Sequence, residues 1–284
     1  MHPLLDRCAV VMAHPDDEVL WASAVLGRAG RIVLCFGEVA SKPALGAGRR
    51  RAMAAFPLPG AVHLDLAESE VFGGADWPLP EETPAGLAVR RRPGAMAGFS
   101  QARYEANQAR LAGLLTERLR GCADVVTHNP WGEYGHEEHV QVLRAVAAAQ
   151  ASLGFRIWVT GYCSDKSAPL MRRHLARLGP PTPPLPTDPA LGDRLRRLYQ
   201  ETGCWTWFDD YVWPETEVFY PWPAGAGTGA ETAPPPRPGA VHPLNHVWLG
   251  WTKPPPPAPL PVRLARRLAR PLRRRFATTG AKPR

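Results

Sequence analysis

The feature that most constrains the fold of this chain is a regular alternation of short apolar runs with longer helical patterns. Short runs rich in Val, Ile and Leu are typical of buried strands, whereas apolar residues repeated every three or four positions indicate helices. We expect strands over residues 8–12, 31–36, 61–64, 125–128 and 157–161. We expect helices near residues 17–29, 48–56, 101–120, 136–152 and 190–202. This order predicts an α/β protein with a Rossmann-like, mostly parallel sheet that is flanked by helices and joined by right-handed crossovers.

The first apolar run leads directly into a polar segment, Ala13-His14-Pro15-Asp16-Asp17-Glu18. A polar cluster at the carboxyl end of a strand, where a helix begins, lies where α/β proteins place their chemistry. His14 and Asp17 are three residues apart with a proline between them, so the turn can direct both side chains to one point. An imidazole and a carboxylate placed in this way form a plausible half of a metal site.

A second polar segment, Gly135-His136-Glu137-Glu138-His139, follows the apolar run at residues 123–127 and opens an Ala-rich helical stretch. His136 and His139 are three residues apart, so on a helix they share one face. Imidazole and carboxylate ligands suit zinc, and three protein ligands with one open position are typical of a catalytic zinc site. A parallel sheet would bring both polar segments to its carboxyl edge.

The two segments together resemble the paired signatures of one protein family. Residues 13–18 read AHPDDE and residues 135–139 read GHEEH, which is similar to the AHPDDE and GHxxH motifs of the LmbE-like (PIG-L) metal-dependent de-N-acetylases. The resemblance covers roughly the first 165 residues. Family members remove an acyl group, usually acetyl, from the nitrogen of an amino sugar. The resemblance therefore implies a zinc-dependent N-deacetylase with a small-molecule amino-sugar substrate, and Fe²⁺ is an alternative to Zn²⁺.

Residue by residue, the resemblance assigns roles to five side chains of the two motifs. It implies that His14, Asp17 and His139 hold the metal. It implies that Asp16 is the catalytic general base. His136 would be the second catalytic residue, which faces the developing oxyanion or assists the leaving amine.

Three further residues are candidates for contacts with substrate. Tyr134 matches a tyrosine that some family members place beside the substrate carbonyl, and Glu38 resembles a position that contacts the sugar. Many members carry an R-x-x-E pattern after the second strand, where this chain has Arg49-Arg50-Arg51-Ala52-Met53 and no glutamate. We therefore expect a basic contact there and take Arg50 as its representative, since the sequence does not decide among the three arginines.

Two residues near the motifs receive structural interpretations. Glu138 stands where the second motif of the family often has aspartate, and we expect this position to face away from the metal. His128 follows the strand-like run at residues 125–127. We interpret it as structural, because His-Asn-Pro is also an ordinary turn.

The chemistry of amide hydrolysis accounts for this set of residues. A bound Zn²⁺ lowers the pKa of water to about 7 and polarises an amide carbonyl. A nearby carboxylate accepts a proton from the attacking water and returns one to the departing amine. Because Asp16 and Asp17 are adjacent, one can bind the metal while the other faces the water. His136 or Tyr134 can stabilise the oxyanion.

Each motif also has a structural explanation, and the chain has two functional alternatives. Acidic residues in a first helical turn stabilise the helix through its dipole, and paired histidines can lie on the surface of an amphipathic helix. One functional alternative is an amidase acting on a thiol conjugate or an antibiotic precursor. The other is a non-catalytic saccharide- or nucleotide-sugar-binding Rossmann protein. Metal content distinguishes the binding protein from the hydrolases, and free-amine release across a substrate panel distinguishes the two hydrolases.

The positive charge of the chain is concentrated at its C-terminal end. The formal net charge is +8, from 34 basic and 26 acidic residues, but residues 253–284 contain ten of the basic residues and none of the acidic ones. Residues 1–252 are thus nearly neutral, which argues against nucleic-acid binding. Leucines recur every fourth residue among the arginines of 262–276, a pattern associated with membrane surfaces or an acidic partner. We prefer a disordered tail, because Pro- and Arg-rich segments rarely fold alone.

Composition divides the chain into three parts. We expect a catalytic core over residues 1–165, a Trp-rich part over 166–252 that packs on the core, and a Pro/Arg-rich tail over 253–284. The Gly- and Pro-containing stretch 66–100 is expected to be a lid or substrate loop. No apolar run reaches the roughly 18 residues of a membrane span, and no signal-type segment begins the chain. We therefore expect a cytoplasmic protein, with peripheral attachment to the membrane as the alternative. The sequence does not reveal its oligomeric state.

Overall fold

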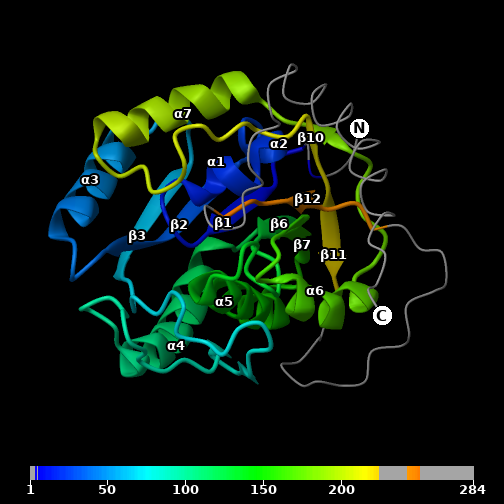
Figure 1. The fold of residues 1–284 in the computed structure, drawn as a ribbon. Helices are drawn as coiled ribbons and strands as arrows, with labels where there is room; N and C mark the ends of the chain where they lie inside the picture. The colour runs from blue at the N-terminus through cyan, green and yellow to red at the C-terminus, as the bar shows by residue number, and fades with distance from the viewer. Residues whose placement is uncertain (1–3, 5, 224–241, 250–284) are drawn as a thin grey trace, which may run out of the picture. The chain divides into compact units, whose positions relative to one another are not determined.

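The computed structural model describes residue 4, residues 6–223 and residues 242–249 (Figure 1). Met1–Val247 form one compact unit, and Trp248–Arg284 are a second unit of which two residues are described. The tail expected at 253–284, with its basic segment 262–276, lies outside the described residues. The following description concerns the first unit.

A six-stranded sheet runs through the unit. Its spatial order is β3 (Ala61–Ala67), β2 (Arg31–Glu38), β1 (Ala9–Met12), β6 (Asp124–Thr127), β7 (Arg156–Thr160) and β11 (Phe219–Trp222). The first five strands are parallel, and β11 pairs with β7 in the antiparallel direction. This order confirms the predicted Rossmann-like, mostly parallel sheet.

Helices cover both faces of this sheet (Figure 1). They are α1 (Asp17–Trp21), α2 (Ser23–Leu26), α3 (Pro43–Ala54), α4 (Gln101–Arg118), α5 (Glu137–Leu153), α6 (Ala168–His174), a 3₁₀ turn (Leu175–Arg177) and α7 (Pro189–Glu201). The single helix expected over residues 17–29 is divided in two. Ala22 has φ of −140°, outside the helical range, and this breaks the helix between α1 and α2.

Three two-stranded pairs complete the secondary structure of the described residues. They are β4 (Glu82–Thr83) with β5 (Gly86–Leu87), β9 (Leu185–Pro186) with β10 (Thr216–Glu217), and β8 (Tyr162–Cys163) with β12 (Asn245–His246). The β4–β5 hairpin lies within the stretch 66–100, which therefore has structure of its own. No helix among the described residues is long and apolar enough to cross a membrane.

Alternate residues of the strands build two apolar layers. In β1, Ala9 and Val11 join the cluster that contains α4 and α5, whereas Val10 and Met12 join the cluster that contains α1, α2 and α7. All four residues are buried. Because both faces are covered, the central strands consist of nearly continuous apolar runs, which is why the sequence revealed them.

The order of the strands determines where a site can form. From β1 the chain proceeds through β2 to β3 on one side, and it later fills the other side through β6 and β7. The order therefore reverses between β1 and β6, which are paired neighbours. Ligands of open α/β sheets bind at such a reversal, beyond the carboxyl ends of the strands. Both polar motifs begin there.

The Trp-rich part contributes to the same sheet. Its strand β11 pairs with β7 from Phe219 opposite Thr160 to Trp222 opposite Ile157. Helix α7 packs against α1, α2 and α3. The expected domain limits at 165 and 252 stay predictions, but part of the C-terminal portion is an edge of the core sheet.

Candidate metal centre

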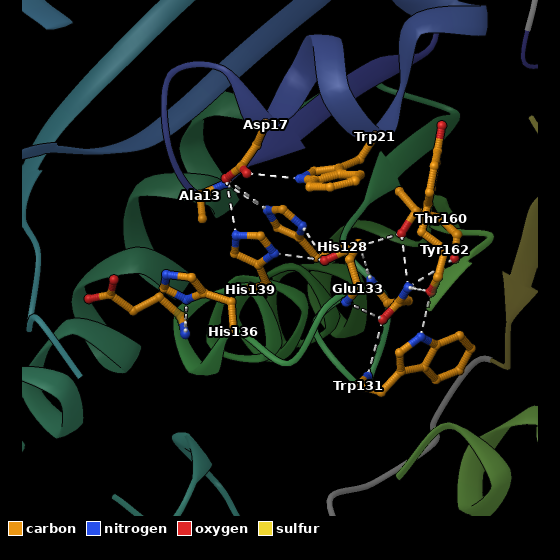
Figure 2. A network of polar contacts seen from close by, with 12 residues as sticks. Ala13, Asp17, Trp21, His128, Trp131, Glu133, His136, His139, Thr160 and Tyr162 are labelled. Atoms are coloured by element: carbon orange, nitrogen blue, oxygen red, sulfur yellow. Dashed lines mark hydrogen bonds and ion pairs between the residues drawn. The ribbon is translucent and has the colours of Figure 1, made fainter. Parts of the chain in front are cut away.

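The turn after β1 holds the carboxylate of Asp17 in one position. The N–H of His14 donates to Oδ2 of Asp17 (2.8 Å), and the indole N–H of Trp21 donates to Oδ1 (2.9 Å). Asp16 has φ of 105°, a left-handed conformation that residues other than glycine rarely adopt. Both oxygens of the Asp17 carboxylate are thus fixed by the fold, and Figure 2 shows the bond from Trp21.

The loop after β6 positions the second motif. Oδ1 of Asn129 accepts the N–H of Glu133 (2.9 Å). Gly132 has φ of 65°, and a Cβ atom there would lie 2.4 Å from the carbonyl oxygen of His136, so glycine is required. His136 caps α5, because its Nδ1 accepts the N–H of Glu138 (3.2 Å). This cap sets the position of the first helical turn.

The structure brings three of the predicted ligands together. Nδ1 of His14 lies 3.1 Å from Oδ2 of Asp17, and Nε2 of His139 lies 3.3 Å from the same oxygen. All three side chains are buried. The ring of His136 is stacked on that of His139, with centroids 4.5 Å apart, and is half-buried. The two motifs therefore meet, as the fold predicts, whereas metal binding by these residues stays a prediction.

A buried carboxylate orients the ring of His139. Oε2 of Glu133 lies 2.7 Å from Nδ1 of His139 and 3.0 Å from Nδ1 of His128 (Figure 2). Nε2 of His128 accepts the N–H of Ala13 (2.8 Å). Both nitrogens of His128 are thus engaged, which agrees with its structural interpretation. Nε2 of His139, by contrast, is buried and faces Oδ2 of Asp17, 3.3 Å away.

These residues fit a divalent metal ion. Among the described residues, three groups have ligand atoms within 4.8 Å of one another, and the predicted ligands are divided among them. The groups are His14 with His136 and His139, Asp17 with His128 and His139, and His14 with Glu68 and Glu138. Two imidazoles and one carboxylate oxygen match the ligands that zinc prefers in catalytic sites. A bound metal would engage both Nε2 of His139 and Oδ2 of Asp17, which face each other at 3.3 Å.

Glu138 contacts the ring of a candidate metal ligand, whereas the expectation that it faces away from the metal stays a prediction. Oε2 of Glu138 lies 3.1 Å from Nε2 of His14, and its Oε1 accepts the N–H of Ser69 (2.6 Å). Oε1 of Glu68 is also near, 3.5 Å from Nε2 of His14. The loop after β3 closes over the first turn of α5 and holds Glu138 toward the ring. No local pattern in the sequence indicates this contact, because it joins segments that are distant in the chain.

One of the three arginines of α3 reaches this cluster. Arg49 is buried and forms an ion pair with Glu68. Arg50 has a half-exposed side chain that lies 3.5 Å from Asp65. Glu38 is exposed at the end of β2, where its carbonyl accepts the N–H of Glu68 (2.8 Å). The structure therefore places Arg49, rather than Arg50 or Glu38, next to the carboxylates around His14, and the substrate contacts of Arg50 and Glu38 stay predictions.

The candidate base Asp16 is held by the C-terminal part. Its Oδ2 accepts both the N–H (2.9 Å) and the hydroxyl (2.7 Å) of Thr206. Burial, with a further contribution from the charge of Asp17, raises the pKa of Asp16 to about 7, although the bonds from Thr206 act to lower it. A carboxyl group with a pKa near neutrality can both accept and return a proton at working pH.

Negative charge dominates the centre. Burial by itself would lower the pKa of His14, but the charges of Glu68, Asp17 and Glu138 raise it to about 10. Burial is likewise outweighed at His139, where Asp17 and Glu133 raise the pKa to about 9. At both rings, the charge of the neighbouring carboxylates therefore outweighs the effect of burial on the pKa. The cluster attracts positive charge, which a divalent cation would supply.

His136 and Tyr134 stay neutral beside the centre. Burial, followed by the positive charges of His139 and His14, holds the pKa of His136 well below its usual value. Because Nδ1 of His136 accepts a hydrogen bond from the backbone, its proton lies on Nε2, which can donate. Burial raises the pKa of the Tyr134 hydroxyl, whose ring packs edge-on against His139 at 5.4 Å. Two neutral donors therefore border the cluster.

Several residues of the centre escaped the sequence analysis. They are Glu68, Ser69, Glu133 and Thr206. Glu68 and Ser69 directly follow β3, so the rule that chemistry gathers at carboxyl ends of strands could have found them. Glu133 lies between two glycines just before the second motif. Thr206 comes from a distant part of the chain and has no local signal.

Comparisons with known proteins give a distant likeness of fold. No family model matches the chain, and no curated protein matches it. Among solved structures, a deacetylase–teicoplanin complex from teicoplanin biosynthesis is 14% identical, with a TM-score of 0.44, over 76% of this chain and 97% of that one. A zinc-inhibited form of a teicoplanin deacetylase is 14% identical, with a TM-score of 0.45 and the same coverage. A pseudoaglycone deacetylase is 14% identical, with a TM-score of 0.42, over 76% and 96%. Likeness at this level says nothing of chemistry.

Proposed function

We propose that the protein is a metal-dependent hydrolase that removes an N-acyl group, acetyl in the simplest case, from an amino sugar or glycoconjugate. One observation supports this proposal above the others. Two buried imidazoles, those of His14 and His139, face a single oxygen of Asp17, and each has a carboxylate on its other ring nitrogen. Carboxylate–histidine pairs of this kind are typical of metal ligands.

His14, Asp17 and His139 would hold the metal, which is zinc or a similar divalent ion. When bound, such an ion polarises an amide carbonyl and lowers the pKa of water. Asp16 adjoins these ligands in the chain, and its pKa of about 7 suits a group that accepts the proton of the attacking water. The same carboxyl then returns that proton to the departing amine.

Two neutral donors would stabilise the oxyanion that develops on the amide. His136 carries its proton on Nε2, and the hydroxyl of Tyr134 stays protonated at all working pH values. Donors that are fixed before the reaction lower the barrier because they need no reorganisation. Asp16 and His136 therefore have separate roles, with proton transfer at the first and charge stabilisation at the second.

An aromatic border next to the centre suits a sugar ring. Phe72 is stacked on His136 with centroids 4.9 Å apart, and 39% of its surface is exposed. Phe72 also lies 5.8 Å from Tyr134, Tyr134 contacts Trp207 at 4.9 Å, and Trp207 contacts the exposed ring of Phe208 at 5.1 Å. Aromatic faces bind the apolar face of a sugar while polar tips remain wet. Substrate contacts by Arg50 and Glu38 are part of the same proposal.

Metal content and amine release test the proposal together. The full chain, purified without added chelator, should contain about one equivalent of zinc or a similar metal, and it should release free amine from N-acetylated amino sugars. Asp17→Ala should lose both metal and activity. Asp193→Ala is the control, because Asp193 is an exposed aspartate of α7 that pairs with Arg196. A wild-type chain without metal but with bound saccharide would favour a binding protein, and amine release from thiol conjugates alone would favour the other amidase.

A further inference from the structure

His14 and His139 present different ring nitrogens to the same carboxylate oxygen. His14 faces Oδ2 of Asp17 through Nδ1 (3.1 Å), whereas His139 faces it through Nε2 (3.3 Å). A neutral imidazole carries one proton, and the nitrogen without the proton is the one that can bind a metal. The partner of the opposite nitrogen therefore decides which atom of each ring is available.

Each opposite nitrogen meets a buried glutamate. Oε2 of Glu138 lies 3.1 Å from Nε2 of His14, and Oε2 of Glu133 lies 2.7 Å from Nδ1 of His139. An ionised carboxylate only accepts hydrogen bonds, so it retains the ring proton on the nitrogen it faces. Glu138 therefore leaves Nδ1 of His14 free, and Glu133 leaves Nε2 of His139 free.

Neither glutamate can turn away from its ring. The second oxygen of Glu138 accepts the N–H of Ser69 (2.6 Å), and the second oxygen of Glu133 accepts the N–H of Asn129 (3.0 Å) and the hydroxyl of Thr160. Both glutamates have at most 1% of their surface exposed. The two carboxylates are therefore fixed by the backbone before any ligand binds.

We propose that Glu138 and Glu133 are positioning residues which hold His14 and His139 in opposite tautomers, so that the metal is bound through Nδ1 of His14 and Nε2 of His139. This inference rests on the metal site of the proposed function. It extends that proposal to an atom-by-atom prediction, and it gives a role to Glu138, which we expected from the sequence to face away from the metal.

The test uses zinc alone as the probe, with Glu137→Gln as a matched control. Glu137 adjoins Glu138 in the first turn of α5 and is equally buried, but its carboxylate accepts N–H groups of Gly73, Ala75 and Trp77 instead of a ring. A glutamine at 138 or 133 offers an N–H where the ring needs an acceptor. Competition with a chelator should show zinc affinity lowered about 10- to 100-fold in Glu138→Gln and Glu133→Gln, and unchanged in Glu137→Gln.

A second measurement needs no substitution at either glutamate. In zinc-loaded wild-type protein labelled with ¹⁵N-histidine, the ring signals should show a proton on Nε2 of His14 and on Nδ1 of His139. The variants His14→Asn and His139→Asn assign these signals. Coordination of both rings through the same nitrogen overturns the inference, even if the glutamine variants fail to fold.

The outcomes separate this inference from the proposed function. Zinc binding by the wild type with unchanged affinity in both glutamine variants overturns the positioning roles and leaves the hydrolase proposal intact. A wild-type chain that binds no zinc overturns both. An equal loss of affinity in Glu137→Gln shows a general effect of the helix terminus, which also overturns the inference.

Discussion

The two halves of the candidate centre are built in different ways. The loop after β6 is largely self-contained, since Asn129 and Thr160 fix Glu133, and Glu133 fixes both His128 and His139. The turn after β1 depends instead on the C-terminal part of the chain. The loop after β6 is therefore stabilised locally. The turn after β1 is complete only when a distant segment has folded onto it.

Hydrogen bonds tie the turn after β1 and helix α1 to residues 199–213. Thr206 donates twice to Asp16, the hydroxyl of Tyr199 donates to Oε1 of Glu18 (2.6 Å), and the indole of Trp213 donates to the carbonyl of Val19 (2.7 Å). The candidate base therefore takes its orientation from the Trp-rich part, and the metal ligand His139 takes its orientation from the β6 loop. Substitutions in the two regions should affect different properties.

The largest effect is expected from a substitution of the candidate base Asp16, which should lower activity without removing the metal. Asp16→Asn should lower kcat by about 10²- to 10⁴-fold, the range for loss of a general base, while the metal content stays near that of the wild type. The reason is that Asp16 bonds to Thr206 and is not one of the residues whose ligand atoms cluster around His139. Metal analysis and kcat of the same preparation check this. Full activity in Asp16→Asn would show that another group is the base.

A smaller loss of activity is expected from a substitution of Tyr134 in the loop after β6. Tyr134→Phe keeps the ring against His139 and removes the hydroxyl, so the protein should fold and bind metal normally. If the hydroxyl stabilises the oxyanion, kcat should fall by about 10²- to 10³-fold with little change in KM. Steady-state kinetics on an N-acetylated amino sugar measure both constants. A rise in KM alone would instead place Tyr134 in ground-state binding.

The sequence predicted the parts of this molecule that depend on local pattern. The β1 strand is apolar on both faces and leads into the first motif, and the rule for carboxyl edges then brings His14, Asp17 and His139 together. Glu138 and Thr206 could not be placed in the same way. Their contacts with His14 and Asp16 join residues that are more than a hundred positions apart, and no periodicity carries information about such pairs.

The sequence was less informative about residues whose role depends on the direction of the side chain or on the backbone conformation. Three consecutive arginines on α3 point in different directions. Only Arg49 is buried, where its charge pairs with that of Glu68. The broken helix at Ala22 is similar, since alanine favours helices and the residue type gives no sign of a φ of −140° there. Sequence patterns therefore located the centre but not the carboxylates and donors that orient it.

The pH dependence of kcat/KM tests whether the hydrogen bonds from Thr206 to Asp16 tune the candidate base, and we expect a moderate effect. Asp16 must be ionised to act as a base, and its pKa is about 7, so kcat/KM should fall as the pH drops through 7. The bonds from Thr206 favour the ionised form and lower this pKa. Thr206→Val should therefore raise it and move the acidic limb of the pH profile upward. The variant should lose a few-fold activity at pH 7 and recover at higher pH, and an unchanged limb would contradict the link.

The smallest effect concerns Arg50, whose contact with the sugar is a prediction from the motif alone. Its side chain is half-exposed and lies 3.5 Å from Asp65, an ion pair worth about 0–1 kcal/mol at the surface. Arg50→Ala should therefore leave the free energy of unfolding nearly unchanged. If Arg50 binds the sugar through a hydrogen bond, KM should rise by up to about tenfold with kcat unchanged. An unchanged KM would leave Arg49, which is buried against Glu68, as the arginine of α3 that serves the centre.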